Sequence, residues 1–228
     1  MMKKIPLIIS ALVTVGLLFS CNSEKANVAK PPAANKYITK NQTGNFGGYF
    51  YSFWTNGGGS VGMTINPGGN YSVSWNNPGD FTCGVGWSTG TDRNITYNCK
   101  TWESSGGAYL AVYGWTTNPL IEYYIVENWG NFRPTYANVG TVTSDGATYD
   151  LYKHEQVDQP SINGTATFMQ YWSVRRTPTE VGKDHVVTTG NHFKAWTGNG
   201  LKMGRFNYQI MLTEAFGAGG GYSNVTCW

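Results

Sequence analysis

The sequence predicts an all-β fold, a sandwich or a jelly roll, with one short α-helix. From residue 46 onward, short runs of β-branched and aromatic residues are separated by Gly, Asn and Asp. This pattern is typical of strands joined by tight turns. Turn motifs such as NPGGN (66–70) and NNPGD (76–80) recur between the runs. Many short strands with frequent turns favour a sandwich or barrel architecture over an α/β one.

The expected strands and hairpins follow one another along the whole chain after the leader, with no internal repeat and no second domain. Each is rich in Val, Ile, Thr, Tyr, Phe or Trp, which are the residues enriched in strands. They are residues 47–56, 60–66, 68–77, 81–87, 94–99, 108–116, 120–129, 140–157, 166–176, 185–190, 206–217 and 222–228.

One segment has a different periodicity. Phe193, Trp196 and Leu201 are spaced as on one face of a helix, and glycines follow at Gly198 and nearby. Because glycine commonly ends helices, the segment predicts a single short α-helix over about residues 191–198.

The N-terminus has the pattern of an export signal. Residues 1–4 are cationic, and the apolar run that follows is too short and too N-terminal for a membrane span. Leu18, Ser20 and Cys21 resemble a bacterial lipobox, which implies cleavage before Cys21 and a lipid on its thiol. An ordinary signal peptide with an incidental cysteine is the alternative. We therefore expect an exported bacterial protein, either a lipoprotein at the cell envelope or surface or a secreted one.

The chain divides into three predicted parts. Residues 1–20 form the signal peptide, the polar Pro- and Ala-containing residues 21–45 a flexible tether, and residues 46–228 the jelly-roll domain. Membrane contact is expected only through the N-terminal lipid. We expect the protein to be a monomer.

Cysteine and histidine spacing predicts no metal site. The sequence has no CxxC or HxxxH motif, and its three histidines are scattered, so we expect no metal and no cofactor. An oxidising compartment permits a disulfide. Cys83 and Cys99 flank a Gly-containing turn and could face each other across a hairpin, in which case Cys227 would have no disulfide partner. The sequence alone does not decide which cysteines pair.

Composition separates the candidate ligands. The net charge is only +3, without a cluster of Lys or Arg, so nucleic acid is not an expected partner. The 9 Trp and 15 Tyr suit a neutral, polyhydroxylated ligand, because sugar rings stack on aromatic faces. An aromatic-rich core without a binding role is the equally open alternative.

Two carboxylates interrupt apolar, aromatic strands. Glu122 is in phase with Tyr124, and Glu214 is in phase with Tyr208, since strand side chains alternate between faces. Retaining glycoside hydrolysis needs such a pair, about 5–5.5 Å apart: one attacks the anomeric carbon, and the other protonates the leaving oxygen. The alternative is that each glutamate pairs with an arginine, such as Arg133, Arg175, Arg176 or Arg205.

Three long segments carry a family resemblance. YGWTTNPLIEYYIVENWG, HEQVDQPSINGTATFMQYWSVRR and NYQIMLTEAFG resemble the endo-β-1,4-xylanases of glycoside hydrolase family 11, in the family's order and over about residues 46–228. The resemblance implies a β-jelly roll of two curved antiparallel sheets, with xylan bound in a cleft beneath a thumb loop. It also implies cleavage of internal β-1,4 bonds with retention of configuration by double displacement.

The resemblance assigns roles by position in these motifs. Glu122 matches the nucleophile and Glu214 the acid/base, whose pKa is expected to rise through the charge of Glu122 and partly through desolvation. Asp80 matches an Asp or Asn beside the acid/base that modulates its pKa, and the Asp predicts an acidic optimum. The expected substrate-binding residues are Trp54, Tyr113, Trp115, Tyr124, Pro160, Gln170 and Tyr208.

Three positions depart from the family pattern. Ala215 and Phe216 stand where Gly-Tyr usually follows the acid/base, and Gln156 stands near the place of an arginine at the base of the thumb. We assign no role to Gln156 from the resemblance.

Three alternatives to a xylanase remain. They are a jelly-roll endoglucanase, a carbohydrate-binding module and a purely structural surface lipoprotein. A binding module needs aromatic residues but no pair of in-phase glutamates.

Overall fold

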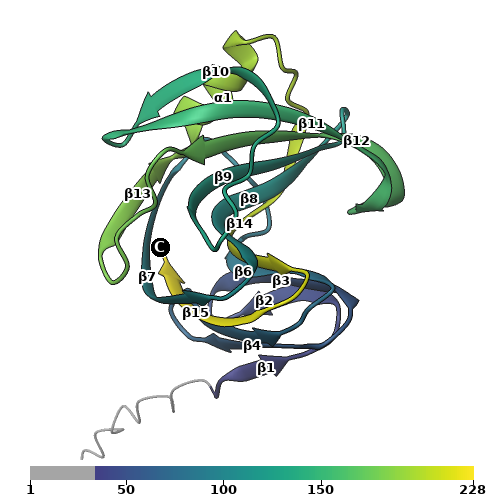
Figure 1. The fold of residues 1–228 in the computed structure, drawn as a ribbon, viewed down its shortest axis with the longest axis vertical. Coiled ribbons are helices and arrows are strands. Elements are labelled where there is room, and N and C mark those ends of the chain that lie inside the picture. Colours follow the sequence, from purple (N-terminus) through teal and green to yellow (C-terminus); the bar gives the residue numbers. More distant parts are fainter. Residues whose placement is uncertain (1–33) are drawn as a thin grey trace, which may run out of the picture. The chain divides into compact units, whose positions relative to one another are not determined.

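The computed structural model describes residues 34–228, which form two β-sheets and one helix. In spatial order, the six-stranded sheet consists of β1 (Lys36–Ile38), β4 (Ser60–Asn66), β5 (Asn70–Asn76), β15 (Gly220–Cys227), β7 (Asn94–Ser104) and β13 (Asp184–Thr188). The nine-stranded sheet consists of β10 (Ala137–Ser144), β11 (Ala147–Ser161), β12 (Gly164–Arg175), β9 (Ile121–Trp129), β8 (Gly107–Thr117), β14 (Arg205–Phe216), β6 (Asp80–Trp87), β3 (Tyr49–Gly57) and β2 (Gln42–Phe46) (Figure 1).

The prediction of a jelly roll of two antiparallel sheets is confirmed, with one exception in the pairing. Strands β9 and β12 are parallel, with Glu122 opposite Gln170. Two parallel neighbours need a crossover connection, and here the chain between them forms β10 and β11.

The central strands of the large sheet are buried on both faces. One face, with Tyr123 and Met211, packs with the six-stranded sheet in the main core, and the other carries a second cluster around Tyr113 and Trp172. A strand covered on both sides is apolar nearly throughout. This double burial explains the continuous apolar runs of β8 and β9.

The predicted helix is confirmed as α1, Thr189–Gly198, which begins slightly before the expected residue 191. It packs beside β10 (Figure 1). Asp145, in the turn after β10, accepts hydrogen bonds from the Thr188 backbone N–H (2.8 Å) and hydroxyl (2.7 Å). Trp196, fully buried, anchors the helix to the core.

The folded domain begins earlier than predicted. The expected tether, residues 21–45, overlaps strands β1 and β2. Ile38 is buried in the core, and β1 pairs with β4, so apolar burial and backbone pairing order this segment. The predicted signal peptide, Cys21 and the first part of the tether lie outside the described residues.

The cysteines are unpaired in the described structure. Cys83 lies on β6 of the large sheet and Cys99 on β7 of the smaller one, so they do not face each other across a hairpin. Both, together with Cys227, are buried free thiols. Within residues 34–228, no group of three His, Cys, Asp or Glu side chains is placed to hold a metal ion. Nor is any helix in that range long and apolar enough to cross a bilayer.

Candidate active site

The second aromatic face of the large sheet forms the floor of a cleft of ≈ 620 Å³. Strands from both halves of the sheet contribute to it, and the hairpin between β11 and β12 supplies Pro160, Ser161 and Ile162 to its rim. Every site residue predicted from the sequence lines this one cleft: Trp54, Asp80, Tyr113, Trp115, Glu122, Tyr124, Pro160, Gln170, Tyr208 and Glu214.

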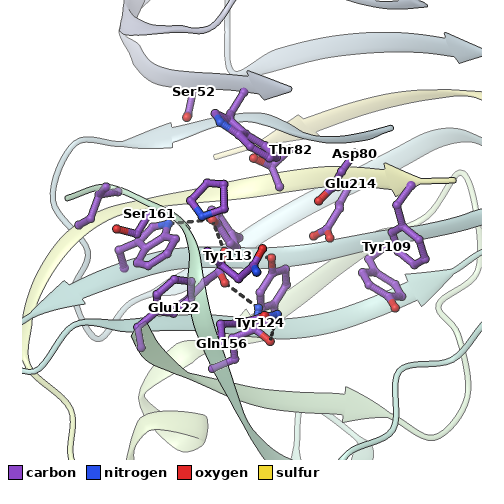
Figure 2. Close-up of a pocket in the computed structure, with 18 of the residues that line it drawn as sticks. Ser52, Asp80, Thr82, Tyr109, Tyr113, Glu122, Tyr124, Gln156, Ser161 and Glu214 are labelled. Atoms are coloured by element: carbon purple, nitrogen blue, oxygen red, sulfur yellow. Dashed lines mark hydrogen bonds between the residues drawn. The ribbon is translucent and has the colours of Figure 1, made fainter. Parts of the chain in front are cut away.

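Glu122 is held by three hydrogen-bond donors. The Tyr113 and Tyr124 hydroxyls donate to its Oε1 at 2.6 and 3.1 Å, and the Gln170 amide donates to its Oε2 at 2.7 Å (Figure 2). Trp115 Nε1–H in turn donates to the Tyr113 hydroxyl oxygen at 2.7 Å. Both carboxylate oxygens are therefore satisfied, which fixes the orientation of the group although it is buried.

Burial and hydrogen bonding shift the pKa of Glu122 in opposite directions. Burial raises the pKa of Glu122, and the hydrogen bonds from Gln170, Tyr113 and Tyr124 lower it in part. Burial and the charge of Glu122 also raise the pKa of Tyr113 well above its ordinary value. The Tyr113 hydroxyl consequently stays protonated and can donate to an ionised Glu122.

Glu214 has a contrasting environment. It is buried, and its Oε2 has no hydrogen-bond partner among residues 34–228. Burial is the largest cause that raises the pKa of Glu214 well above its ordinary value, followed by the charges of Asp80 and Glu122. Desolvation, and not the charge of Glu122 expected from the resemblance, is the dominant cause, because the strand neighbours of Glu214 enclose it.

Asp80 shares this environment. Burial and then the charge of Glu122 raise the pKa of Asp80 to about 7. Its Oδ1 is buried and, in the described part of the chain, lacks a partner. Figure 2 shows the Asp80 and Glu214 side chains projecting next to each other into the cleft. Asp80 and Glu214, with their raised pKa values, can supply a proton to a bound molecule. Glu122, which hydrogen-bond donors hold in the same cleft, can supply a negative charge.

A row of residues across the sheet connects Glu214 with the aromatic rim. In register, Trp54 on β3 lies opposite Thr82 on β6, and Thr82 lies opposite Glu214 on β14. Tyr109 on β8 follows on the other side of Glu214. Half-buried Trp54 thus presents its ring along the cleft on the same side as Glu214.

The structure adds aromatic residues that the sequence analysis did not assign to the site. Tyr124 and Trp172 are stacked, with ring centroids 3.9 Å apart and an interplanar angle of 4°. Trp172 also packs against Tyr136, with ring centroids 5.2 Å apart. The strand phase that Trp172 shares with Gln170 could have identified it. The other added lining residues include Tyr109, Phe132, Phe168 and Phe216.

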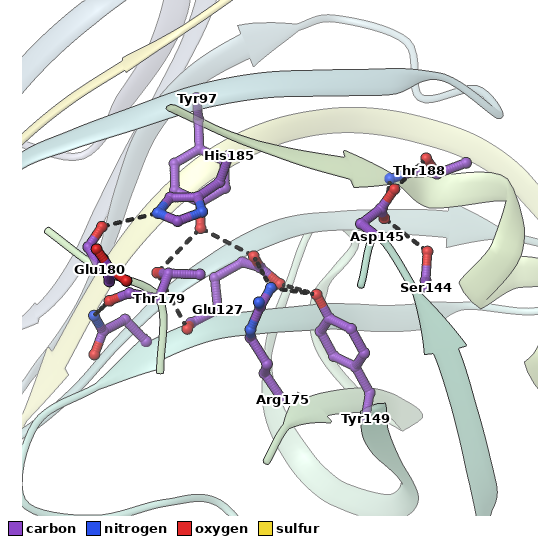
Figure 3. Close-up of polar contacts among 11 residues, drawn as sticks. Tyr97, Glu127, Ser144, Asp145, Tyr149, Arg175, Thr179, Glu180, His185 and Thr188 are labelled. Atoms are coloured by element: carbon purple, nitrogen blue, oxygen red, sulfur yellow. Dashed lines mark hydrogen bonds and ion pairs between the residues drawn. The ribbon is translucent and has the colours of Figure 1, made fainter. Parts of the chain in front are cut away.

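Arginine pairing does not explain Glu122 or Glu214. No ion pair in the described structure involves either residue, whereas Arg133 and Arg176 both pair with Asp150. Arg175 instead pairs with Glu127 at 3.3 Å. Glu127 is fully buried and accepts hydrogen bonds from Tyr97 (2.9 Å) and Tyr149 (2.6 Å) (Figure 3).

Gln156 also belongs to the cleft. Its Nε2 donates to the Gln170 carbonyl oxygen at 3.2 Å, and its side chain lines the cavity. Gln156 lies where the regular pairing of β11 with β12 is interrupted, between Gln156 and Gln159. The family pattern predicts no role for Gln156, because an arginine usually stands near this position.

Comparison with known proteins gives consistent matches over nearly the whole chain. The family model for glycosyl hydrolases family 11 matches residues 46–226. An ethylene-inducing xylanase of Penicillium digitatum is 52% identical over 219 residues, which cover 94% of this chain and 99% of the relative. Endo-1,4-beta-xylanase 2 of Rhizopus oryzae is 50% identical over 216 residues, covering 93% and 98%. Endo-1,4-beta-xylanase B of Penicillium oxalicum is 48% identical over 219 residues, covering 94% and 68%.

Proposed function

Because the chain belongs to glycosyl hydrolases family 11, we propose that it is an endo-1,4-β-xylanase that cleaves internal bonds of xylan with retention of configuration. The observation that carries the proposal is the contrast between two glutamates in one cleft. Glu122 is held by three donors, whereas burial and neighbouring charges favour the protonated form of Glu214.

The first step forms a bond between the Glu122 carboxylate and the anomeric carbon of a xylose unit. At the same time the bond from that carbon to the glycosidic oxygen breaks, and Glu214 transfers its proton to the departing oxygen. The hydroxyls of Tyr113 and Tyr124 and the amide of Gln170 keep the attacking carboxylate in place. Such positioning lowers the barrier because the reacting atoms meet without further reorganisation.

The second step reverses the roles. Once Glu122 is an ester its charge is gone, so one of the influences that raise the pKa of Glu214 disappears. Glu214, now ionised, takes a proton from water as the water oxygen attacks the anomeric carbon and the ester bond breaks. The product regains the configuration of the substrate.

The aromatic lining supports binding of the xylan chain. We propose that Trp54 stacks on a xylose ring and that Trp115 and Tyr208 contact the sugar beside Glu122. The hairpin between β11 and β12, here called the thumb hairpin, would cover the xylan chain with Pro160. Their shared cleft supports these roles. Aromatic faces bind the C–H faces of sugar rings while their polar edges form hydrogen bonds.

Release of reducing sugar from xylan by the full chain tests the proposal. We expect activity in the wild type and in Glu103→Gln, an exposed control away from the cleft. Glu122→Gln and Glu214→Gln should each lose about 10²–10⁴-fold or more. Proton NMR of the fresh product should show the β-anomer. Hydrolysis of carboxymethylcellulose but not xylan would point to an endoglucanase, and xylan binding without cleavage would point to a binding module.

We also propose that the chain is exported and carries a lipid on Cys21. Its support is the sequence of residues 1–21 alone, since the relatives named above are fungal and the lipobox pattern is bacterial. Metabolic labelling with a radioactive fatty acid should label the wild type and Ser23→Ala but not Cys21→Ser. An unlabelled wild type recovered in the medium would show simple secretion instead.

A further inference from the structure

Two amides form a directed chain that ends on Glu122. Gln156 Nε2 donates to Gln170 Oε1 at 3.2 Å, and Gln170 Nε2 donates to Glu122 Oε2 at 2.7 Å. The charge of Glu122 dictates the direction. An ionised carboxylate only accepts hydrogen bonds, so Gln170 must turn its NH₂ group toward Glu122, which leaves its carbonyl oxygen facing Gln156.

The orientation of Gln170 needs a second contact. An amide side chain can rotate by half a turn and exchange its oxygen and nitrogen with little change in shape. If Gln170 turned in this way, its carbonyl oxygen would face a carboxylate oxygen of Glu122, and a donor would be replaced by a repelling acceptor. The NH₂ of Gln156 opposes this rotation, because it is paired only when the Gln170 oxygen points toward it.

No cation in the described cleft performs this task. The residues that line it include Glu122, Glu214 and Asp80 but no Lys or Arg within the range 34–228. The negative charge of Glu122 is therefore balanced by dipoles, and dipoles balance it only when they are correctly oriented. Chains of hydrogen bonds also strengthen one another in a poorly solvated site.

We infer that Gln156 is a positioning residue, which acts through Gln170 and holds the Gln170 amide in the orientation that donates to Glu122. Gln156 sits on β11 where regular pairing with β12 stops and the thumb hairpin begins. It is half-buried and close to Gln170 in register, since Gln156 lies opposite Phe168. The kinetic part of this inference rests on the proposed xylanase function.

A double-mutant cycle in the full chain tests the inference. Gln156→Ala should lower kcat on xylan by about 2- to 10-fold, the effect of one hydrogen bond, and leave KM nearly unchanged. In a Gln170→Ala background, Gln156→Ala should have no further effect, because the group it orients is missing. Gln156→Glu should lose more than Gln156→Ala, since an ionised carboxylate at this position accepts from the Gln170 NH₂ and turns the Gln170 oxygen toward Glu122.

A second readout does not depend on turnover. The protein is labelled with ¹³C at the glutamate carboxyl, and the Glu122 resonance is followed as the pH changes. This resonance should titrate at higher pH in Gln156→Ala and in Gln170→Ala than in the wild type. The double variant should show the same titration as Gln170→Ala. Other groups that bear on this titration are Glu214 on β14, Asp80 on β6 and the surrounding tyrosines. His154 on β11 is a further neighbour, because it lies opposite Gln170 of β12 in register. All of these are unchanged in the variants.

Matched controls separate the outcomes. Val157→Glu adds a charge at the next residue, which is exposed and does not line the cleft, and should leave kcat and the Glu122 titration as in the wild type. Equal unfolding midpoints would exclude a general loss of folding.

Two outcomes would overturn the inference. If the losses of kcat in the two single variants added up in the double variant, Gln156 would act on the substrate directly. The other outcome is an unchanged kcat and titration in Gln156→Ala. If the wild type itself failed to cleave xylan, the proposed function would fall, while the titration would still decide the inference.

Discussion

Asp80 and Glu214 are diagonal neighbours on the adjacent antiparallel strands β6 and β14. In register, Asp80 lies opposite Phe216 and Glu214 lies opposite Thr82, so both carboxyls project from the same face of the sheet. Each has a buried oxygen without a partner among the described residues. Two such groups titrate as a pair, and the first proton to leave the pair belongs to neither residue alone.

Replacing Asp80 should move the pH profile of activity. We expect catalysis to need both protons of the Asp80–Glu214 pair. Burial and the charge of Glu122 raise the pKa of Asp80 to about 7, whereas burial, followed by the charge of Asp80, raises the pKa of Glu214 well above its ordinary value. The pair therefore loses its first proton at a lower pH than Glu214 would lose its own. Asp80→Asn removes the more acidic of the two groups, so the basic limb of kcat/KM should move to higher pH. A profile in the variant that superimposes on the wild type would refute the modulating role of Asp80 and the acidic tendency that we predict.

Asp80 should also make stability depend on pH. Burial raises the pKa of Asp80 from 3.8 to about 7, so between these values the folded chain binds more protons than the unfolded one. The contribution is fully present below about pH 4 and is lost as the pH rises through about 7, with each unit of pKa difference corresponding to about 1.4 kcal/mol.

Asp80→Asn should remove this pH dependence. The free energy of unfolding of the variant, relative to the wild type, should therefore increase between pH 4 and pH 8. Chemical denaturation across that range measures the difference. Asp92→Asn, at a carboxyl outside the cleft, serves as the control. An equal pH dependence in the wild type and in Asp80→Asn would contradict the prediction.

The roles of the two glutamates should separate with leaving-group chemistry. A dinitrophenolate needs no proton to depart, so Glu214→Gln should lose about 10²–10⁴-fold on xylan but still form the glycosyl-enzyme from a dinitrophenyl xylobioside. Because the variant lacks the base for the second step, the intermediate should accumulate as a burst, and mass spectrometry should find it on Glu122. Glu122→Gln should give neither burst nor adduct. Equal losses of Glu214→Gln on both substrates would argue against its role as the acid.

The buried ion pair between Glu127 and Arg175 should matter for stability and not for the pH profile. Arg175→Gln leaves the fully buried Glu127 without its cation and should cost about 3–5 kcal/mol in urea unfolding. Arg176→Gln should cost less than about 1 kcal/mol, because the Arg176 side chain is 56% exposed. The pH profile of the folded Arg175→Gln enzyme should match that of the wild type, and a shifted profile would place this pair within the catalytic electrostatics.

Some parts of the site were predictable from local pattern. The alternation along strands placed Glu122 in phase with Tyr124 and Glu214 in phase with Tyr208, and the cleft contains all four. The helix was predictable for the same reason, since the spacing of Phe193 and Trp196 reflects one buried face.

Other parts depend on which strands become neighbours. Glu127 is fully buried, and Tyr97, Tyr149 and Arg175 reach it from β7, β11 and β12. Cys83 and Cys99 are close in sequence, but they lie in different sheets.

The sequence by itself determined the strand content, the alternation of buried and exposed faces and the two in-phase glutamates, because a two-residue repeat is a local property of an extended chain. Only the tertiary structure decided that Gln156 reaches Gln170 and that desolvation dominates the pKa of Glu214. These relationships arise from register between strands far apart in the chain and from the atoms that enclose each carboxyl. Neither is encoded in the spacing of residues along one strand.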